Sequence, residues 1–313
     1  MSVLITTRAE LEAMQPDGNY LLANDIDLSA APWTPLFSYL TPFVGTLDGG
    51  GFQITGMQIP NNSEGYIALI RQLGFDGESG GLIKNLRLMN VSVWTANTTL
   101  LTVAALVSVN RGTIENCRVS GSVSGGSYTG MLTASNYGSI DRCFTEGTVS
   151  NYNPYLGGLI GNNEVAGIVR HSYSTAQVNG YNHLGGLAGR NSSGKIIRCY
   201  STGRVVGVSS IGGLVGSKNT TAPYEDTGNF WDTTTSQRPT SACGVGRTSA
   251  QMKTPSTFTG WDFNTVWGIH PTINNGYPYL QGFFDPPPAL RRPSGLYVPL
   301  RKPTRIAGLL LKR

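Results

Sequence analysis

The sequence has few charged residues, few cysteines and no long hydrophobic run, and each shortage excludes a class of protein. Charged residues make up only 13% of its 313 positions, too few for typical disorder. Four cysteines over this length do not form a disulfide framework. No apolar run approaches the roughly 18 residues of a membrane span, so no membrane partner is expected. No basic segment followed by an apolar core opens the chain, so we expect no secretory signal and completion in a cytoplasm.

Catalytic motifs are also missing. The three histidines are His171, His183 and His270, and none stands in a His-Glu-x-x-His motif. The chain has no Walker motif, no nucleophile elbow and no Cys-x-x-Cys pair. Its GGLxG segments lack the strand–loop–helix context of dinucleotide loops. We therefore expect no enzymatic activity, no catalytic residue, no cofactor and no metal.

The positive charge is concentrated at one end of the chain. The formal net charge is +5, and seven of the 23 basic residues, with no acidic residue, lie in 286–313. The remaining 16 basic and 18 acidic residues give the rest a net charge of −2. Nucleic acid is therefore not an expected partner of the whole protein.

A repeat of about 27 residues runs through a chain whose 41 glycines and many Val, Ile, Thr and Tyr residues favour β structure. Each repeat starts with a pair of small residues: Ala104-Ala105, Thr129-Gly130, Gly157-Gly158, Gly185-Gly186 and Gly212-Gly213. An apolar pair follows: Leu106-Val107, Met131-Leu132, Leu159-Ile160, Leu187-Ala188 and Leu214-Val215. Four further columns are Asn110, Asn136, Asn163 and Asn191; Ile114, Ile140, Ile168 and Ile196; Cys117, Cys143, Ser172 and Cys199; and Val123, Val149, Val178 and Val205.

Such repeats can bury their apolar faces by stacking, because each strand can pair with the equivalent strand of the next coil, about 4.8 Å away. The repeat predicts an all-β fold, a single-stranded parallel β-helix (solenoid) of about 27-residue coils, right-handed and with roughly three strands per coil. The leucine and isoleucine columns should face inward, and the asparagines should form a ladder. Cys117, Cys143 and Cys199 are interpreted as core thiols, with a disulfide or metal site as the alternatives.

A family resemblance rests on these repeats. The segments "GGLIG", "GGLAG" and "GGLVG", with "SYSTAQV" and "CYSTGRV", resemble the GLUG-motif repeats of bacterial and phage surface proteins. Gly18–Ser29 and Phe43–Ile59 resemble the family's lead-in, and Asn229–Gln237 and Asn274–Leu280 its closing segment. The resemblance covers roughly residues 1–281 and implies the fold and a surface location, but no particular activity. The Ala104 repeat departs from the Gly-Gly pattern.

Four segments are expected along the chain. They are an N-terminal cap with first strands (1–64), the GLUG-type repeats (65–228), a C-terminal aromatic cap (229–285) and a Pro-rich basic arm (286–313). Thr7 and Glu10 fit a capping box that opens a short helix, and "LDGGGFQI" suggests a tight hairpin. The caps would cover open sheet edges.

Two features of the C-terminal part invite a binding hypothesis. Trp231, Trp261 and Trp267 could form a sugar platform, but a hydrophobic plug for the last coil is the preferred interpretation. The arm is interpreted as an extended assembly element that contacts a partner protein. Its candidate contact residues are Arg291, Arg292, Tyr297, Arg301, Lys302, Arg305, Leu309, Leu310 and Leu311. The alternatives for the arm are a contact with nucleic acid and a disordered tail.

Glu115 and Asp141 are the best candidates for an acid pair. They share a column, so their carboxylates could lie about 5 Å apart, the separation that retaining glycosidases use. Arg142 and Arg170 are expected nearby, and the preferred interpretation is a solvated turn with balanced charges. A second pair, Glu225 and Asp226, follows the repeats.

Three functions remain open at this stage. The leading hypothesis is a structural phage virion protein, such as a tail fibre, spike or decoration protein with a role in host attachment. It would be made in the host cytoplasm and would join other virion proteins through the arm. The second is a bacterial surface adhesin, and the third a polysaccharide-degrading β-helix enzyme. A homo-oligomer and a host-surface glycan are further candidate partners.

Overall fold

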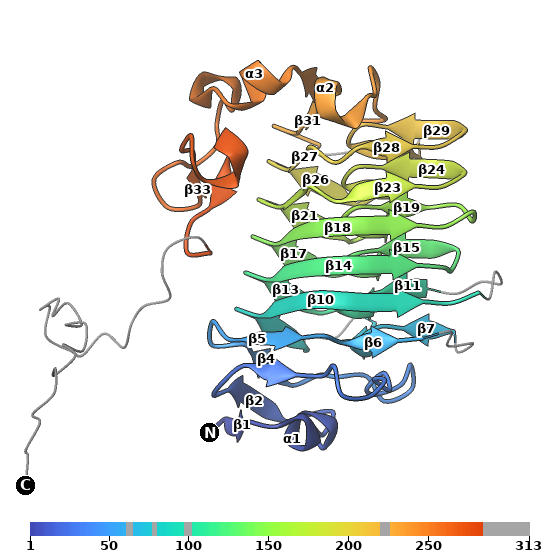
Figure 1. Cartoon of the computed structure of the whole chain (residues 1–313), viewed down its shortest axis with the longest axis vertical. Helices are drawn as coiled ribbons and strands as arrows, with labels where there is room; N and C mark the ends of the chain where they lie inside the picture. The colour runs from blue at the N-terminus through green and yellow to red at the C-terminus, as the bar shows by residue number, and fades with distance from the viewer. Residues whose placement is uncertain (61–64, 77–79, 97–101, 220–225, 284–313) are drawn as a thin grey trace, which may run out of the picture.

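The solenoid consists of four parallel sheets, A to D, that stack along one axis (Figure 1). The structure, a computed structural model, describes residues 1–60, 65–76, 80–96, 102–219 and 226–283. Sheet A contains β1 (Val3–Ile5), β2 (Asn19–Leu22), β4 (Thr46–Asp48), β9 (Leu82–Lys84), β13 (Thr113–Glu115), β17 (Ser139–Asp141), β21 (Ile168–Arg170) and β26 (Lys195–Ile197). Sheet C contains β8 (Ile70–Leu73), β12 (Val107–Asn110), β16 (Thr133–Asn136), β20 (Ile160–Asn163), β25 (Ala188–Asn191) and β30 (Val215–Lys218).

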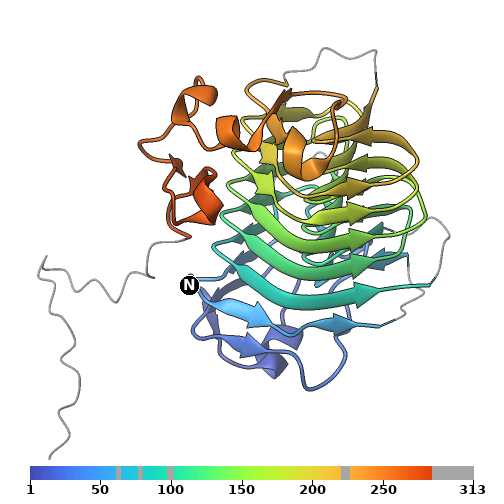
Figure 2. The same cartoon turned by 45° about the horizontal axis from the view of Figure 1, so that its top comes forward.

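Sheets B and D complete each coil (Figure 2). Sheet B contains β3 (Ile26–Asp27), β5 (Gln53–Thr55), β6 (Gln58–Ile59), β10 (Arg87–Trp94), β14 (Arg118–Ser124), β18 (Phe144–Ser150), β22 (Tyr173–Ser174), β23 (Gln177–Asn179), β27 (Tyr200–Ser201), β28 (Val205–Val206), β31 (Phe230–Asp232) and β32 (Val245–Arg247). Sheet D contains β7 (Tyr66–Ile67), β11 (Thr102–Ala104), β15 (Tyr128–Gly130), β19 (Leu156–Gly157), β24 (Asn182–Gly185) and β29 (Ser209–Gly212).

Each coil runs through sheets A, B, D and C, and so has four strands where the sequence predicted about three. One coil, for example, consists of β13, β14, β15 and β16 before β17 begins the next. The extra strand arises because the small and apolar pairs do not form one continuous strand. The chain bends between them, and Met131 and Leu132 connect β15 to β16. The parallel all-β solenoid with coils of about 27 residues is confirmed.

Backbone pairing corrects the predicted register at two places. Ala104, Gly130, Gly157, Gly185 and Gly212 are paired, at intervals of 26, 27, 28 and 27 residues, so Gly130 rather than Thr129 is the equivalent position. Leu132 therefore replaces Met131 in the leucine ladder, although Met131 is buried as well.

The second correction concerns the isoleucine column. Ile140 pairs with Val169, which pairs with Ile196, so Val169 faces inward and Ile168 lies half-buried on the outer face. Val169 follows Asn163 by six residues, whereas Ile140 follows Asn136 by four and Ile196 follows Asn191 by five, so a longer corner causes this shift. Because side chains alternate in a strand, a one-residue shift exchanges the inner and outer faces.

The solenoid interior otherwise matches the prediction. Leu106, Leu159, Leu187 and Leu214 are completely buried. The asparagine side chains form a hydrogen-bonded ladder from coil to coil, with 2.7 Å from Asn110 Nδ2 to Asn136 Oδ1, 2.8 Å from Asn136 to Asn163 and 3.2 Å from Asn163 to Asn191. The four cysteines, including Cys243, are buried free thiols, so the disulfide alternative is not realised.

The N-terminal segment joins the solenoid directly. Thr7 and Glu10 form the predicted capping box of α1 (Arg8–Glu12). The predicted hairpin at "LDGGGFQI" is wrong, because β4 belongs to sheet A and β5 to sheet B. The glycines there turn a corner between the two sheets, with Gly50 and Gly51 at positive φ.

The C-terminal segment lies along a flank of the solenoid. After β31 it forms α2 (Thr233–Ser236), α3 (Ser249–Met252), the 3₁₀ turns Pro255–Thr257 and Asn274–Gly276, and an antiparallel pair of β33 (Trp267–Gly268) and β34 (Tyr279–Leu280). Trp267 lies 6.1 Å from Tyr173 and 5.9 Å from Tyr200 between ring centroids. The aromatic residues of this segment thus cover the outer face of sheet B over several coils, whereas the sequence predicted a plug for the last coil alone.

Candidate functional groove

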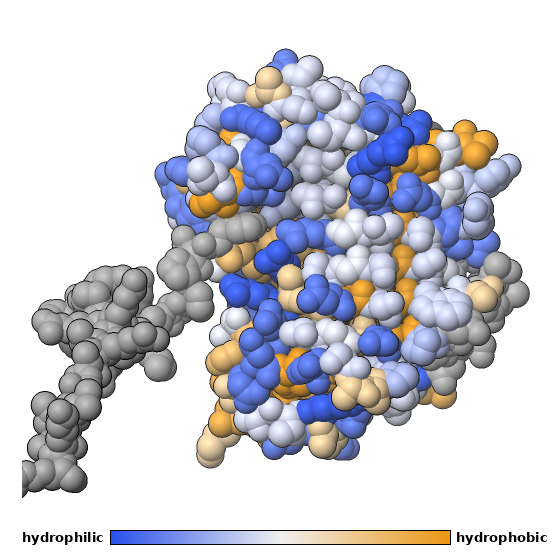
Figure 3. All heavy atoms as spheres, in the orientation of Figure 1, coloured by the Kyte–Doolittle hydropathy of each residue, from blue (hydrophilic) through white to orange (hydrophobic). Residues whose placement is uncertain are grey.

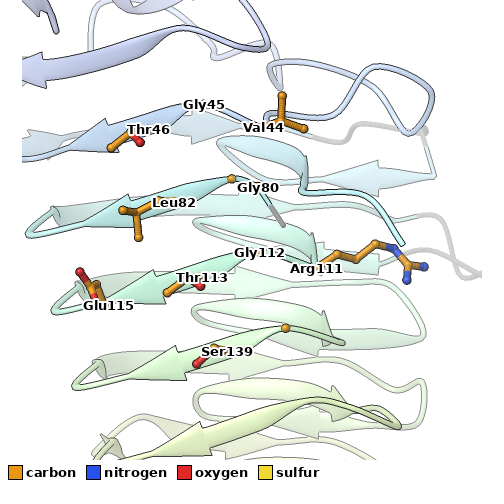
Figure 4. Close-up of a pocket in the computed structure, with 12 residues that line it drawn as sticks. Val44, Gly45, Thr46, Gly80, Leu82, Arg111, Gly112, Thr113, Glu115 and Ser139 are labelled. Carbon is orange, nitrogen blue, oxygen red and sulfur yellow. The ribbon is translucent and has the colours of Figure 1, made fainter. Parts of the chain in front are cut away.

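A groove runs across the outer face of sheet A, over four successive coils. The buried side chains at the centres of β4, β9, β13 and β17 point inward, so the residues on either side of each centre face outward. Thr46, Leu82, Thr113 and Ser139 are paired in register and lie one above another (Figure 4). The groove encloses about 620 Å³. Its lining residues are Val44, Gly45, Thr46, Gly80, Gly81, Leu82, Arg111, Gly112, Thr113, Glu115, Gly138 and Ser139.

Glycines keep the groove open. A Cβ atom on Gly112 would lie 2.2 Å from the carbonyl oxygen of Gly81, and one on Gly138 would lie 2.1 Å from that of Gly112. Real Cβ atoms do not approach so closely, so coil stacking requires glycine at these positions. The same requirement leaves a column without side chains beside the threonines and serine, and this column forms the floor of the groove.

Sheet A places the predicted acid pair together. Glu115 pairs with Asp141 in register, within a column that runs from Asp48 and Lys84 to Arg170. The carboxylate of Asp141 is 3.2 Å from Arg170 Nε, 3.7 Å from Arg142 Nε and 2.9 Å from His171 Nδ1. The prediction that arginines lie nearby is confirmed.

Electrostatics keep Asp141 ionised. Burial alone would raise the pKa of its carboxyl, but the hydrogen bond with His171 and the charges of Arg170, His171 and Arg142 outweigh burial and lower the pKa. A glycosidase general acid needs the opposite shift, because it must carry a proton at working pH. Asp141 is therefore suited to an ion-pair network and not to proton donation.

The remaining acids do not complete a catalytic pair in the groove. Burial raises the pKa of Asp226, which accepts hydrogen bonds from Ile196 N and from Asn191 at the end of the asparagine ladder. Glu225, its predicted partner, lies outside the described residues. Burial also raises the pKa of Glu164, which accepts a 2.6 Å hydrogen bond from Asn162 in β20 of sheet C. Neither Asp226 nor Glu164 lines the groove.

A second feature, missed by the sequence analysis, is an aromatic stack beside sheet D. Ring centroids are 5.0 Å apart for Tyr128 and Tyr155 and 4.7 Å apart for Tyr155 and His183, with nearly parallel planes. The spacing of these residues by one coil was the available signal. His183 Nδ1 is 2.8 Å from Ser217 Oγ, and burial followed by the charge of Arg190 lowers the pKa of its imidazole. Because the rings occupy one another's faces, the stack is not a platform for a sugar ring.

The predicted sugar platform is not exposed either. Trp231, Trp261 and Trp267 are buried, with 5%, 7% and 0% of their surface accessible. The proposed assembly-arm residues, from Arg291 to Leu311, lie outside the described residues. Within the described ranges, no group of three His, Cys, Asp or Glu side chains could hold a metal ion. In the same ranges, no helix has the length and apolarity to cross a membrane.

Comparison with curated proteins gives two partial relatives. The chain is 33% identical over 202 residues to Halomucin of Haloquadratum walsbyi, which covers 59% of this chain and 2% of that protein. It is 34% identical over 133 residues to a protein of Evansella cellulosilytica described as a Gly-rich membrane protein, covering 41% of this chain and 12% of that protein. The chain thus spans a small fraction of both relatives, and neither is described as a virion protein.

Structural and family comparisons agree on the architecture. The fold is similar to the crystal structure of a candidate immunoglobulin A1 protease from Bacteroides ovatus, with a TM-score of 0.65 over 90% of this chain and 92% of the other. Sequence identity is 19%, so the likeness concerns the fold alone. Residues 180–206 match the GLUG motif. That match falls on the coil that carries "GGLAG" and "CYSTGRV", so this coil is a GLUG motif and the resemblance seen in the sequence is supported.

Proposed function

We propose that this chain is the exposed, ligand-binding solenoid of a cell-surface protein of the adhesin type, and that it is not an enzyme. Its curated relatives are named a halomucin and a Gly-rich membrane protein, and both names fit a cell envelope better than a virus particle. The bacterial-surface hypothesis therefore takes precedence over the virion hypothesis. One support of the virion hypothesis was the arm at 286–313, which lies outside the described residues.

The observation that carries the proposal is the uncovered outer face of sheet A. Four coils present one continuous groove there, while the outer face of sheet B lies under the C-terminal segment at β18, β22, β27 and β31. A rigid stack of coils holds such a surface without loss of conformational freedom on binding, which favours affinity. In the nearby acid pair the lowered pKa of Asp141 makes that residue unsuited to proton donation. Binding without catalysis is the function that suits this arrangement.

Location and adhesion can be tested together. Antibodies raised against the full chain should label intact cells of the native producer, and external protease should remove the signal. Beads that carry the purified full chain should adhere saturably to target cells, in competition with soluble protein. Antigen found only inside cells, or only in purified phage particles, would contradict the proposal.

The non-enzymatic part needs a separate assay. Purified full chain should release no product from polysaccharides or from immunoglobulin A1 over long incubations. Product formation that Glu115→Gln or Asp141→Asn abolishes would show that the acid pair is catalytic and would refute this part of the proposal.

A further inference from the structure

The groove on sheet A has polar groups that no other part of the described chain uses. The hydroxyls of Thr46, Thr113 and Ser139 form no side-chain hydrogen bond with another described residue, although their backbone groups belong to the sheet. The Glu115 carboxylate likewise forms no ion pair within the described ranges, unlike its register partner Asp141. Figure 4 shows Thr46, Thr113, Glu115 and Ser139 on one side of the sheet, with Leu82 in the coil between Thr46 and Thr113.

The spacing of these groups is set by the solenoid. Equivalent residues in consecutive coils are about 4.8 Å apart, because that is the distance between paired strands. A ligand that lies along the axis would therefore meet a hydroxyl or a carboxylate at nearly every coil, with Leu82 as an apolar contact between two threonines. A sugar ring has about this length, and it carries hydroxyls at its rim and C–H groups on its faces.

The charge of the groove argues against an anionic ligand. Arg111 is the one basic residue in its lining, and its guanidinium is bonded to Asp76 and lies 4.1 Å from the ring centroid of Tyr137. Glu115 contributes a negative charge that can accept hydrogen bonds from hydroxyl groups. A polyanion would meet Glu115 without a free row of cations, whereas a neutral ligand with many hydroxyls would meet matched donors and acceptors.

We propose that this groove binds a linear, uncharged polysaccharide whose chain lies parallel to the solenoid axis. Thr46, Thr113 and Ser139 bind sugar hydroxyls in three of four successive coils, Glu115 accepts a hydrogen bond from another sugar hydroxyl, and Leu82 packs against a ring face in the coil between the two threonines. The inference rests on the proposed surface function and assigns its ligand class and its site.

The test uses the full chain and a panel of neutral linear hexasaccharides: cello-, xylo-, manno-, malto- and laminari-oligomers. Isothermal titration should find at least one binder. Thr113→Val combined with Ser139→Ala should weaken that binder at least tenfold, and Glu115→Gln should do the same alone, because each removes hydrogen bonds made in the complex. Ser139→Tyr, which fills the groove, should abolish binding. Thr148→Val, an equivalent change on the outer face of sheet B, is the matched control and should bind as wild type.

Salt and anionic probes separate the alternatives. Affinity for the neutral ligand should change less than about twofold between about 50 and 500 mM NaCl, whereas binding through phosphate or carboxylate groups would fall steeply. Tighter binding of polygalacturonate or single-stranded DNA than of every neutral oligomer would overturn the proposal. So would a panel without any binder, or groove variants that bind as wild type.

Cell adhesion distinguishes failure of this inference from failure of the proposed function. If the groove variants still adhere to target cells like wild type, the surface role stands and the groove assignment is wrong. If wild type does not adhere and is absent from the cell surface, the surface role is wrong, whatever the oligosaccharides show.

Discussion

The outer faces of sheets A and B are both built by stacking equivalent residues, but part of one is buried and part of the other is exposed. On sheet B the column Phe144, Tyr173 and Tyr200 forms an aromatic ladder, with ring centroids 4.7 Å apart at both steps. On sheet A an outward column contains Thr46, Leu82, Thr113 and Ser139, of which Ser139 lies in the coil of Phe144, and the column continues to Ile168 and Lys195. The aromatic ladder is buried under the C-terminal segment, while the hydroxyl column remains open as a groove.

The difference shows that the side chains of one column determine whether the outer face of a sheet is buried or exposed. Burying aromatic side chains away from water is energetically favourable, so another segment packs over them. Burying a hydroxyl group costs free energy unless it forms a hydrogen bond, so the hydroxyls stay at the surface. Figure 3, which looks onto the sheet B side, shows hydrophilic residues interspersed with apolar ones and the C-terminal segment packed against the coils. Mutations on the two faces should therefore change the stability of the protein to different extents.

The largest effect on stability is expected in the C-terminal segment that packs on sheet B. Trp267 is completely buried and its indole N–H has no hydrogen-bond partner in the described chain, so Trp267→Ala removes packing alone. We expect a loss of about 3–5 kcal/mol in the free energy of unfolding, measured by chemical denaturation. Tyr152→Ala, at a side chain with 90% exposure, should change stability by less than about 0.5 kcal/mol. Equal effects of the two variants would mean that the C-terminal segment does not pack on sheet B.

The solenoid interior, which both faces share, should respond almost as strongly. Leu187 is completely buried in the leucine ladder, and Leu187→Ala should cost about 2–5 kcal/mol because it leaves a cavity between coils. Thermal and chemical unfolding would measure this loss. Val208→Ala, at a residue with 68% exposure, is the control. A neutral Leu187→Ala would show that the register of the coils is incorrect.

A smaller, pH-dependent effect is expected at the ion-pair network of sheet A. The pKa of Asp141 is lowered in the folded protein, so its stabilising contribution is complete above the ordinary Asp value of 3.8 and is lost as pH falls through the lowered pKa. At neutral pH Asp141→Asn should cost about 1–3 kcal/mol. The gap in stability between wild type and variant should narrow as pH falls below 3.8, with the exposed Asp17→Asn as control. A gap that is constant down to low pH would exclude the network.

The smallest effect is expected in the groove. Thr113→Val and Ser139→Ala should each change the free energy of unfolding by less than about 0.5 kcal/mol, because their hydroxyls bond to no described residue. Denaturation under the same conditions as for Trp267→Ala would measure this. A loss above about 1 kcal/mol would indicate a structural role for these hydroxyls, and the contrast between the two faces would fail.

Much of the interior was predictable because its repeat is local in the sequence. The columns of leucine, asparagine, cysteine and valine recur at intervals of one coil. Hydrophobic burial explains why leucine, cysteine and valine face inward, while the buried asparagines bond to one another from coil to coil. The register errors at Thr129 and Ile168 have a physical cause. Paired residues of consecutive repeats lie 26–29 positions apart because the corners differ in length, and only the pairing of neighbouring strands shows where each insertion lies.

The groove could be predicted only in part. The pairing of Glu115 with Asp141 followed from the column, but the sequence did not reveal that Asp141 would bond to Arg170 and His171 while Glu115 remained at the groove. Thr46 and Leu82 lie outside the strongest repeats, so their alignment with Thr113 and Ser139 had no clear signal. The aromatic residues near the C-terminus were recognisable as a cluster, but their position along sheet B was not.

The sequence by itself determined the fold class, the length of the coils and the identity of most inward columns, because stacking equivalent residues is the way for this repeat to bury its apolar side chains. Tertiary structure alone decided how many strands each coil has, which outer face is covered and where a groove stays open. These outcomes depend on contacts between residues far apart in the chain, such as Trp267 on Tyr173 and the glycines that bring Gly112 against Gly81. No local pattern records such contacts, since they form only when the coils have stacked.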